Sequence, residues 1–228
     1  MRTASKLSPC GRMDVLSAQR VRTKSQQRAA ELGTRFHRGM EEWIKTGNIP
    51  ELRPAQVADW LAGLTTSWVP PPGVECEVAV GLSPEGRYVP VTETEPHVYV
   101  PNDPSHVLLT AGRIDLMWES DGVLLIADAK TGRTDLGDPE RLPQLMALGL
   151  AAADRNKADY IALGLYLARE AQWKWSDAIA MDSEQAAGMW ETVLEYARLD
   201  DSARPGPWCH SICWETACEH HPRHEDAA

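Results

Sequence analysis

The sequence predicts an α/β (α+β) fold in which a central mixed β-sheet is flanked by helices. Apolar residues recur every three or four positions over residues 17–44 and every second position over residues 74–80, so the chain combines amphipathic helices with half-buried strands. The expected elements follow one another as helix, helix, strands, helix, strands, helix, which is typical of helices packed on a mixed sheet. Because 228 residues suffice for one hydrophobic core, we expect a single domain over residues 1–228.

Two helices are expected before the first strand. The first covers about residues 17–44 and ends at the Gly-Asn-Ile-Pro turn of residues 47–50. The second covers residues 54–68 and is closed by the three prolines at residues 70–72.

The rest of the chain alternates strands with two further helices. The Asp121-Gly122 pair between two strongly apolar runs predicts a β-hairpin. Helices are expected at residues 139–154 and 183–199, and an irregular tail from residue 205. Strands are expected at residues 74–80, 87–91, 97–100, 111–118, 123–129, 160–168 and 172–175.

Charge is distributed unevenly along the chain. The formal net charge is −10, yet residues 1–46 carry ten Lys or Arg and only four Asp or Glu. An acidic body with a basic N-terminal helix suits a protein that gathers carboxylates around a metal and offers a separate cationic face to an anionic ligand. A solvated basic helix face is the plain alternative.

Composition excludes several classes of protein. The chain is 43% hydrophobic and 25% charged, which is ordinary for a globular domain and wrong for a disordered or fibrous one. No run approaches the ~18 apolar residues of a membrane span, and the N-terminus lacks the apolar region of a secretory signal. We expect a cytoplasmic protein without a membrane partner.

Two acids and a lysine form the most informative constellation. Asp115 ends the apolar part of one hairpin strand, and Asp128 and Lys130 lie near the end of the other. We expect the two carboxylates to meet at one edge of the sheet, where their repulsion is relieved by a divalent cation. Lys130 projects from the same strand face as Asp128. Such a set suits phosphodiester hydrolysis, in which the metal lowers the pKa of bound water and the ammonium steadies the nucleophile or the developing charge.

At these residues the chain resembles the PD-(D/E)XK nuclease superfamily. Ile114-Asp115 matches its PD element and Asp128-Ala129-Lys130 its (D/E)XK element. The resemblance implies a restriction-endonuclease-like core and a Mg²⁺ or Mn²⁺ ion held by the two acids and the Ala129 carbonyl, with Lys130 at the attacking water.

A glycine and a histidine on the first helix narrow the resemblance to the RecB-like branch, which includes CRISPR-associated exonucleases and AddB-type nuclease domains. Gly33 and His37 match its Gly-x-x-x-His element and lie one turn apart on one helix face. The glycine would let another segment approach the imidazole closely. The resemblance implies that His37 is a further metal ligand.

The branch also has a Gln-x-x-x-Tyr helix after the lysine. Gln144 follows Lys130 by 14 residues, whereas Leu148 occupies the place of the tyrosine. Gln144 is a candidate DNA or active-site contact, and Arg133 a candidate phosphate contact.

A third acid is available on the first strand. Strand alternation puts Glu75 and Glu77 on one face, and Cys76 with Val78 and Val80 on the other. In the family an acid on this strand often points toward the metal, and of these two glutamates we favour Glu77 as a further candidate metal ligand. Both glutamates facing solvent is the alternative.

Three of the five cysteines lie close together near the end of the chain. Clustered thiols bind soft metals once they are deprotonated. Several RecB-like nucleases hold an iron–sulfur cluster on one cysteine upstream of the helical histidine and three near the C-terminus. The resemblance implies a [4Fe–4S] cluster that staples residues 1–16 to residues 205–224. Its ligands would be Cys10, Cys209, Cys213 and Cys218.

Two alternatives to the cluster stay open. Zinc could bind the three C-terminal cysteines together with His210, His220 or His221, or the cysteines could hold no metal. The spacing Cys-x-x-x-Cys-x-x-x-x-Cys differs from the family's usual Cys-x-x-Cys followed by a longer gap. Cys76 is expected to be a buried core residue.

Taken together, these residues predict a metal-dependent phosphodiesterase. The resemblance implies a DNA nuclease, in the first place an exonuclease that acts on single strands or DNA ends in repair, recombination or mobile-element processing. A helicase, recombinase or integrase partner is compatible with the resemblance. Two rival interpretations are a non-catalytic DNA-binding or assembly module of the same fold and a structural zinc-binding protein.

Overall fold

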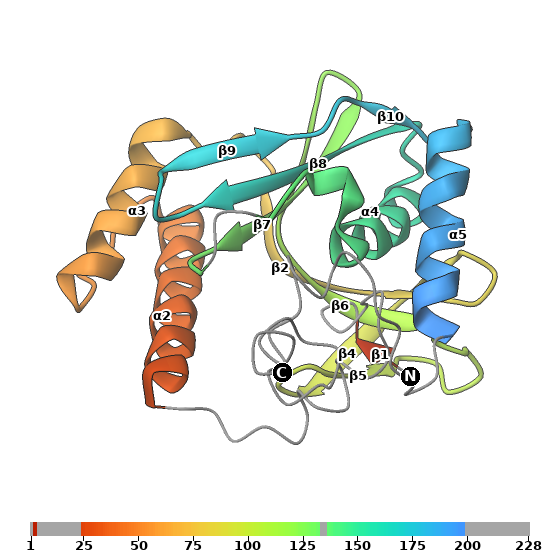
Figure 1. Ribbon diagram of the computed structural model, residues 1–228, viewed down its shortest axis with the longest axis horizontal. Helices are drawn as coiled ribbons and strands as arrows, with labels where there is room; N and C mark the ends of the chain where they lie inside the picture. Colours follow the sequence, from red (N-terminus) through yellow and green to blue (C-terminus); the bar gives the residue numbers. More distant parts are fainter. Residues whose placement is uncertain (1, 4–23, 133–135, 199–228) are drawn as a thin grey trace, which may run out of the picture.

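One mixed sheet organises the molecule, with α2 and α3 on one side and α4 and α5 on the other (Figure 1). The computed structural model describes residues 2–3, 24–132 and 136–198. The elements are β1 (Arg2–Thr3), α2 (Lys24–Thr46), α3 (Ala55–Ser67), β2 (Glu75–Leu82), β3 (Tyr88–Val89), β4 (Val91–Glu95), β5 (Val98–Pro101), β6 (Thr110–Ser120), β7 (Val123–Lys130), η2 (Pro139–Arg141), α4 (Pro143–Asn156), β8 (Tyr160–Leu167), β9 (Gln172–Trp175), β10 (Ile179–Ala180) and α5 (Glu184–Arg198).

The main sheet has the strand order β10-β8-β7-β6-β2-β3, with β1 also paired to β6 and β9 to β8. The expected hairpin is present: β6 and β7 are antiparallel, and both Asp121 and Gly122 have positive φ at the turn. β7 and β8 are parallel and are connected through α4, so the sheet is mixed as expected. β4 and β5 form a separate two-stranded sheet.

Each face of the sheet is covered by its own hydrophobic core. The α4-side core joins the strands to α4 and α5, and the α2-side core joins them to α2 and α3. The α4-side core includes Val80, Ile114, Met117, Ile126, Leu148 and Leu163. The α2-side core includes Phe36, Met40, Leu61, Leu116, Ala127 and Tyr166. Burial on both faces fixes the strands rigidly, and their ends can therefore hold side chains in defined positions.

Strand β2 departs from the expected alternation at Glu77. Cys76 packs against the α2-side core, whereas Val78 packs against the α4-side core. The prediction that these two residues share a face is therefore wrong. The physical reason is the backbone of Glu77, which has φ 56° and so leaves the extended conformation that alternation assumes.

The remaining differences from expectation are small. The helix expected at residues 139–154 is divided into η2 and α4, because Pro143 begins a new helix at its first position. β10 was not expected from the sequence. Residues 17–23 of the expected first helix lie outside the described residues. None of the described helices is long and apolar enough to cross a membrane.

Candidate metal centre

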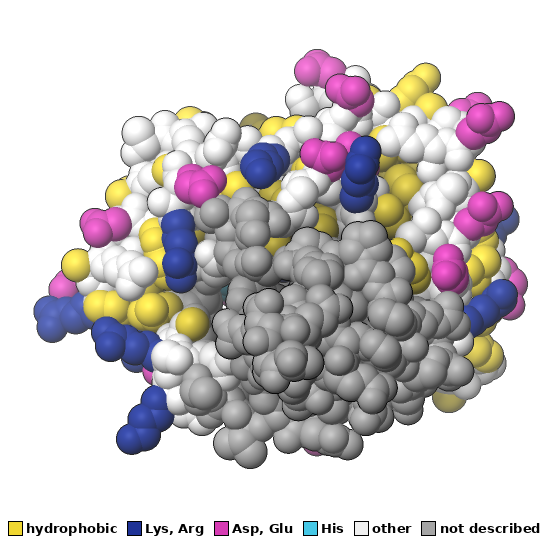
Figure 2. Space-filling view, viewed as in Figure 1, with side chains coloured by type: hydrophobic (Ala, Val, Ile, Leu, Met, Phe, Trp, Pro, Cys, Tyr) yellow, Lys and Arg dark blue, Asp and Glu magenta, His cyan; other side chains and the backbone are white. Residues whose placement is uncertain are grey.

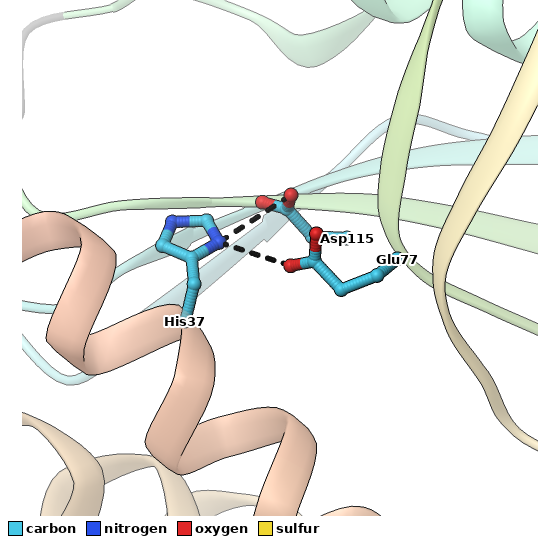
Figure 3. Close-up of side chains that lie close together, drawn as sticks. All are labelled: His37, Glu77 and Asp115. Carbon is cyan, nitrogen blue, oxygen red and sulfur yellow. Dashed lines mark ion pairs between the residues drawn. The ribbon is translucent and has the colours of Figure 1, made fainter. Parts of the chain in front are cut away.

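Three side chains from three different elements converge at the α2 side of the sheet (Figure 3). His37 comes from α2, Glu77 from β2 and Asp115 from β6. His37 Nδ1 lies 3.4 Å from Asp115 Oδ1 and 3.6 Å from Glu77 Oε1. One donor atom from each of the three lies within 4.8 Å of the others.

The histidine is placed by a close approach of α2 to the end of β7. A Cβ atom at Gly33, one turn before His37, would lie 3.0 Å from Thr131 Oγ1. This is the approach that the glycine was expected to permit. His37 Nε2 donates to the backbone oxygen of Ala129 at 3.1 Å. A hydrogen bond from one ring nitrogen to a carbonyl fixes the imidazole orientation, so Nδ1 is left facing the two carboxylates.

Asp115 links the histidine to β7. Its Oδ2 accepts a hydrogen bond of 2.7 Å from the amide of Ala129. Burial alone would raise the pKa of Asp115, but the charge of His37 and the hydrogen bonds from His37 and Ala129 lower it. Burial would likewise lower the pKa of His37, whereas Asp115 and Glu77 raise it well above its usual value. Both shifts favour a protonated imidazole beside an ionised Asp115 carboxylate when no metal is bound.

Asp128, Lys130 and Gln144 form a second, adjoining cluster. Lys130 Nζ lies 2.6 Å from Asp128 Oδ2, and Gln144 Nε2 donates to Asp128 Oδ1 at 3.2 Å. Lys130 Nζ also donates to Gln144 Oε1 at 3.4 Å. Burial raises the pKa of Asp128, reinforced by Asp115 and opposed by Lys130. The two acids are thus close enough to influence each other's ionisation.

The two clusters meet at Ala129. Ala127 and Ala129 pack in the α2-side core, and alternation turns Asp128 and Lys130 toward α4, where Gln144 lies. The compact group of three donors contains Glu77 rather than Asp128. Asp128 as a direct metal ligand, and the Ala129 carbonyl beside it, therefore stay predictions.

Glu77 enters the site because β2 turns there. Glu75 pairs instead with Arg155 of α4, at 2.8 Å from Arg155 Nη2. The prediction that Glu75 and Glu77 project together is wrong, because the positive φ of Glu77 sends its side chain to the α2 side. Arg113 forms an ion pair with Glu77. Arg113 was not among the residues expected at the site. The signal in the sequence that could have found it is its position two residues before Asp115, which strand alternation places on the same face.

The donor set fits a hard divalent cation. Carboxylate oxygens and one imidazole nitrogen suit Mg²⁺ or Mn²⁺. Within the part of the chain that the structure describes, the buried Glu77 Oε1 has no hydrogen-bond partner. Its ion-pair partner, His37 Nδ1, lies 3.6 Å away, beyond hydrogen-bond distance. A cation between Glu77, Asp115 and His37 would give this buried oxygen a direct partner.

Several predicted site residues cannot be placed in this geometry. Arg133 and the four expected cluster cysteines at positions 10, 209, 213 and 218 lie outside the described residues. Leu148, in the place of the family tyrosine, is 2% exposed within the α4-side core. That position therefore packs against the sheet.

A known protein family matches most of this chain. No curated protein matches the chain. A solved protein described as "Crystal structure of SSO0001" is similar over 90% of this chain and 91% of its own, at 14% sequence identity and a TM-score of 0.37. The sequence model of one protein family, the PD-(D/E)XK nuclease superfamily, matches residues 12–219. Since that match spans most of the sequence, the protein belongs to the PD-(D/E)XK nuclease superfamily, whose membership implies metal-dependent hydrolysis of phosphodiester bonds.

Proposed function

We propose that this protein is a DNA nuclease of the RecB-like branch, an exonuclease that acts on single strands or DNA ends in repair, recombination or mobile-element processing. The observation that carries the proposal is the convergence of His37 and Asp115 beside the Asp128–Lys130 pair. The hairpin sequence predicts Asp115, Asp128 and Lys130 at one site, and the resemblance to the RecB-like branch adds His37.

The site residues have two roles: some would bind the metal ion, and Lys130 would act on the attacking water. His37, Asp115, Asp128 and the Ala129 carbonyl would hold Mg²⁺ or Mn²⁺, with Glu77 as a further acid. When bound, the ion would lower the pKa of its water and offset the charge on the phosphate.

Lys130 is placed to position or activate the attacking water. Its ammonium is anchored by Asp128 and by Gln144, and Asp128 raises its pKa despite burial. Lys130 therefore stays charged and can stabilise negative charge that develops at the phosphate.

The α2 helix supplies cations for the DNA backbone. Several dark blue side chains lie at the lower left of Figure 2, near α2 and the start of α3. A cavity of about 770 Å³ lies between α2 and the start of α3. Arginines line it together with apolar side chains, a combination that suits phosphates and bases of a single strand. The lining includes Arg28, Arg35, Arg53, Leu32, Leu52 and Pro54.

Two glutamates in the same cavity reduce this attraction. Glu51 pairs with Arg53 at 3.2 Å, and Glu31 also lines the cavity. Arg28 and Arg35 form no ion pair among the described residues and are therefore the stronger candidates. Replacing both by alanine should weaken DNA binding and reduce its salt dependence. Arg87→Ala, on the far turn between β2 and β3, is the control.

The test of catalysis is degradation of labelled single-stranded and end-blocked DNA with Mg²⁺ or Mn²⁺. We expect Asp128→Asn and Lys130→Gln to abolish cleavage, and the exposed Asp159→Asn to leave it unchanged. Equal activity of the wild type and an Asp128→Ala, Lys130→Ala double variant would refute the assignment. DNA binding without metal-dependent turnover would favour the non-catalytic module, and protection of DNA with blocked ends would favour an exonuclease.

We also propose a [4Fe–4S] cluster on Cys10, Cys209, Cys213 and Cys218 that joins the two ends of the chain. Its support is the resemblance of the cysteine positions to those of RecB-like nucleases. Protein purified without oxygen should be brown and contain iron and sulfide. A colourless protein containing zinc would favour the alternative site with a C-terminal histidine.

A further inference from the structure

Arg113 lies between the candidate metal centre and the small β4–β5 sheet. Its Nε forms an ion pair with Glu77 Oε2, and its Nη1 donates to Glu93 Oε2 at 3.1 Å. Glu93 in turn accepts a hydrogen bond of 2.7 Å from the amide of His97, in the turn of the β4–β5 hairpin. A continuous line of contacts therefore runs from this hairpin through Glu93 and Arg113 to Glu77.

These contacts engage one oxygen of the Glu77 carboxylate and leave the other facing the candidate metal centre. Arg113 occupies Oε2, while the other oxygen, Oε1, faces His37 Nδ1 and has no hydrogen-bond partner among the described residues. Only an arginine offers a planar fork whose separate N–H groups can contact two carboxylates at once, whereas a lysine is a single point charge. The two contacts together fix the rotation of both acids.

The backbone of Glu77 gives an independent sign that its position is imposed. A non-glycine residue with φ 56° is unfavourable by about 1–3 kcal/mol and persists where its surroundings demand it. With ordinary extended geometry the Glu77 side chain would follow Glu75 to the opposite side of the sheet. The local conformation and the Arg113 contact thus act in the same direction.

We propose that Arg113 is a positioning residue that aims Glu77 Oε1 at the divalent cation, and that Glu93 holds Arg113 in place. The inference rests on the proposed metal-dependent function. It predicts that Arg113 strengthens metal binding although it carries the same sign of charge as the metal. Simple electrostatics predicts the opposite sign, since removing a nearby cation should tighten binding of another.

The test measures Mn²⁺ affinity of the full chain by calorimetry, without DNA. We expect Arg113→Gln to weaken Mn²⁺ binding about tenfold or more, as is usual when a partner of a metal ligand is removed. Arg113→Lys keeps the charge and should also weaken binding, because it cannot bridge both carboxylates. In a Glu77→Gln background, Arg113→Gln should cause no further loss, because Arg113 acts through Glu77.

Two hairpin variants separate positioning from a general loss of charge. Glu93→Gln should weaken Mn²⁺ binding, whereas Glu95→Gln removes the same charge from an exposed site of the same hairpin and should not. Circular dichroism checks that each variant is folded, and Glu93→Gln carries the test if an Arg113 variant is not.

Unchanged or tighter Mn²⁺ binding in folded Arg113 variants, or equal effects of the two hairpin variants, would overturn the inference. A wild type that binds Mn²⁺ but cuts no DNA would defeat the nuclease proposal and leave the positioning role standing. A wild type that binds no Mn²⁺ would defeat both.

Discussion

Replacing Gly33 by alanine tests the close approach that brings His37 to the end of β7. In a helix interior, alanine is more favourable than glycine by about 0.8–1.0 kcal/mol. Here the added Cβ would lie 3.0 Å from Thr131 Oγ1, so the threonine has to move or rotate. An off-rotamer side chain costs about 0.5–1.5 kcal/mol. The two effects nearly cancel, and we expect Gly33→Ala to change the free energy of unfolding by less than about 0.5 kcal/mol.

Gly188→Ala is the matched control. Gly188 also lies inside a helix, α5, and a Cβ there would meet no atom within 4 Å. This variant should gain the full helix propensity of about 1 kcal/mol, which raises Tm by about 2–4 °C for a chain of this size. Denaturant unfolding followed by circular dichroism measures both variants.

A second background isolates the contact itself. In a Thr131→Ala protein the obstructing oxygen is gone, so Gly33→Ala should gain as much as Gly188→Ala does. If Gly33→Ala is equally stabilising with and without the threonine hydroxyl, α2 does not approach the end of β7 as described. The placement of His37 would then lose its physical basis.

Three further outcomes follow from the geometry. Because Asp115 and Glu77 raise the pKa of His37 well above its usual value, a metal ion that binds His37 must displace its proton. The Mn²⁺ affinity measured by calorimetry should therefore rise about tenfold per pH unit below that pKa. An affinity that does not change with pH, or a pH dependence that His37→Gln leaves unaltered, would contradict this. Phe36 is fully buried, and Phe36→Ala should lower the free energy of unfolding by about 3–5 kcal/mol in urea; a loss below 1 kcal/mol would contradict its core position. A Cβ at Gly164 would overlap the Trp175 ring, so Gly164→Ala should cost about 1–3 kcal/mol and shift the tryptophan fluorescence, whereas an unchanged spectrum would place that ring elsewhere.

The hairpin that carries the acids could be read from the sequence because its signals are local. Two strongly apolar runs located β6 and β7, and the Asp-Gly pair between them located their turn. Likewise, the glycine one turn before His37 indicated a close approach to α2, which Thr131 makes. Helix and strand periods, turn residues and short spacings act over a few residues, so they survive in a single sequence.

The assembly of the metal centre depended on contacts that sequence distance conceals. Alternation predicted Glu75 and Glu77 on one face, but the tertiary structure turns β2 at Glu77, sending Glu75 to Arg155 and Glu77 to His37. Nothing local indicates that Glu93 would anchor Arg113 across 20 residues. A backbone takes an unfavourable φ only when packing and ion pairs from distant segments compensate for it. The sequence alone therefore determined which residues could do the chemistry, while long-range packing decided which of them face one another.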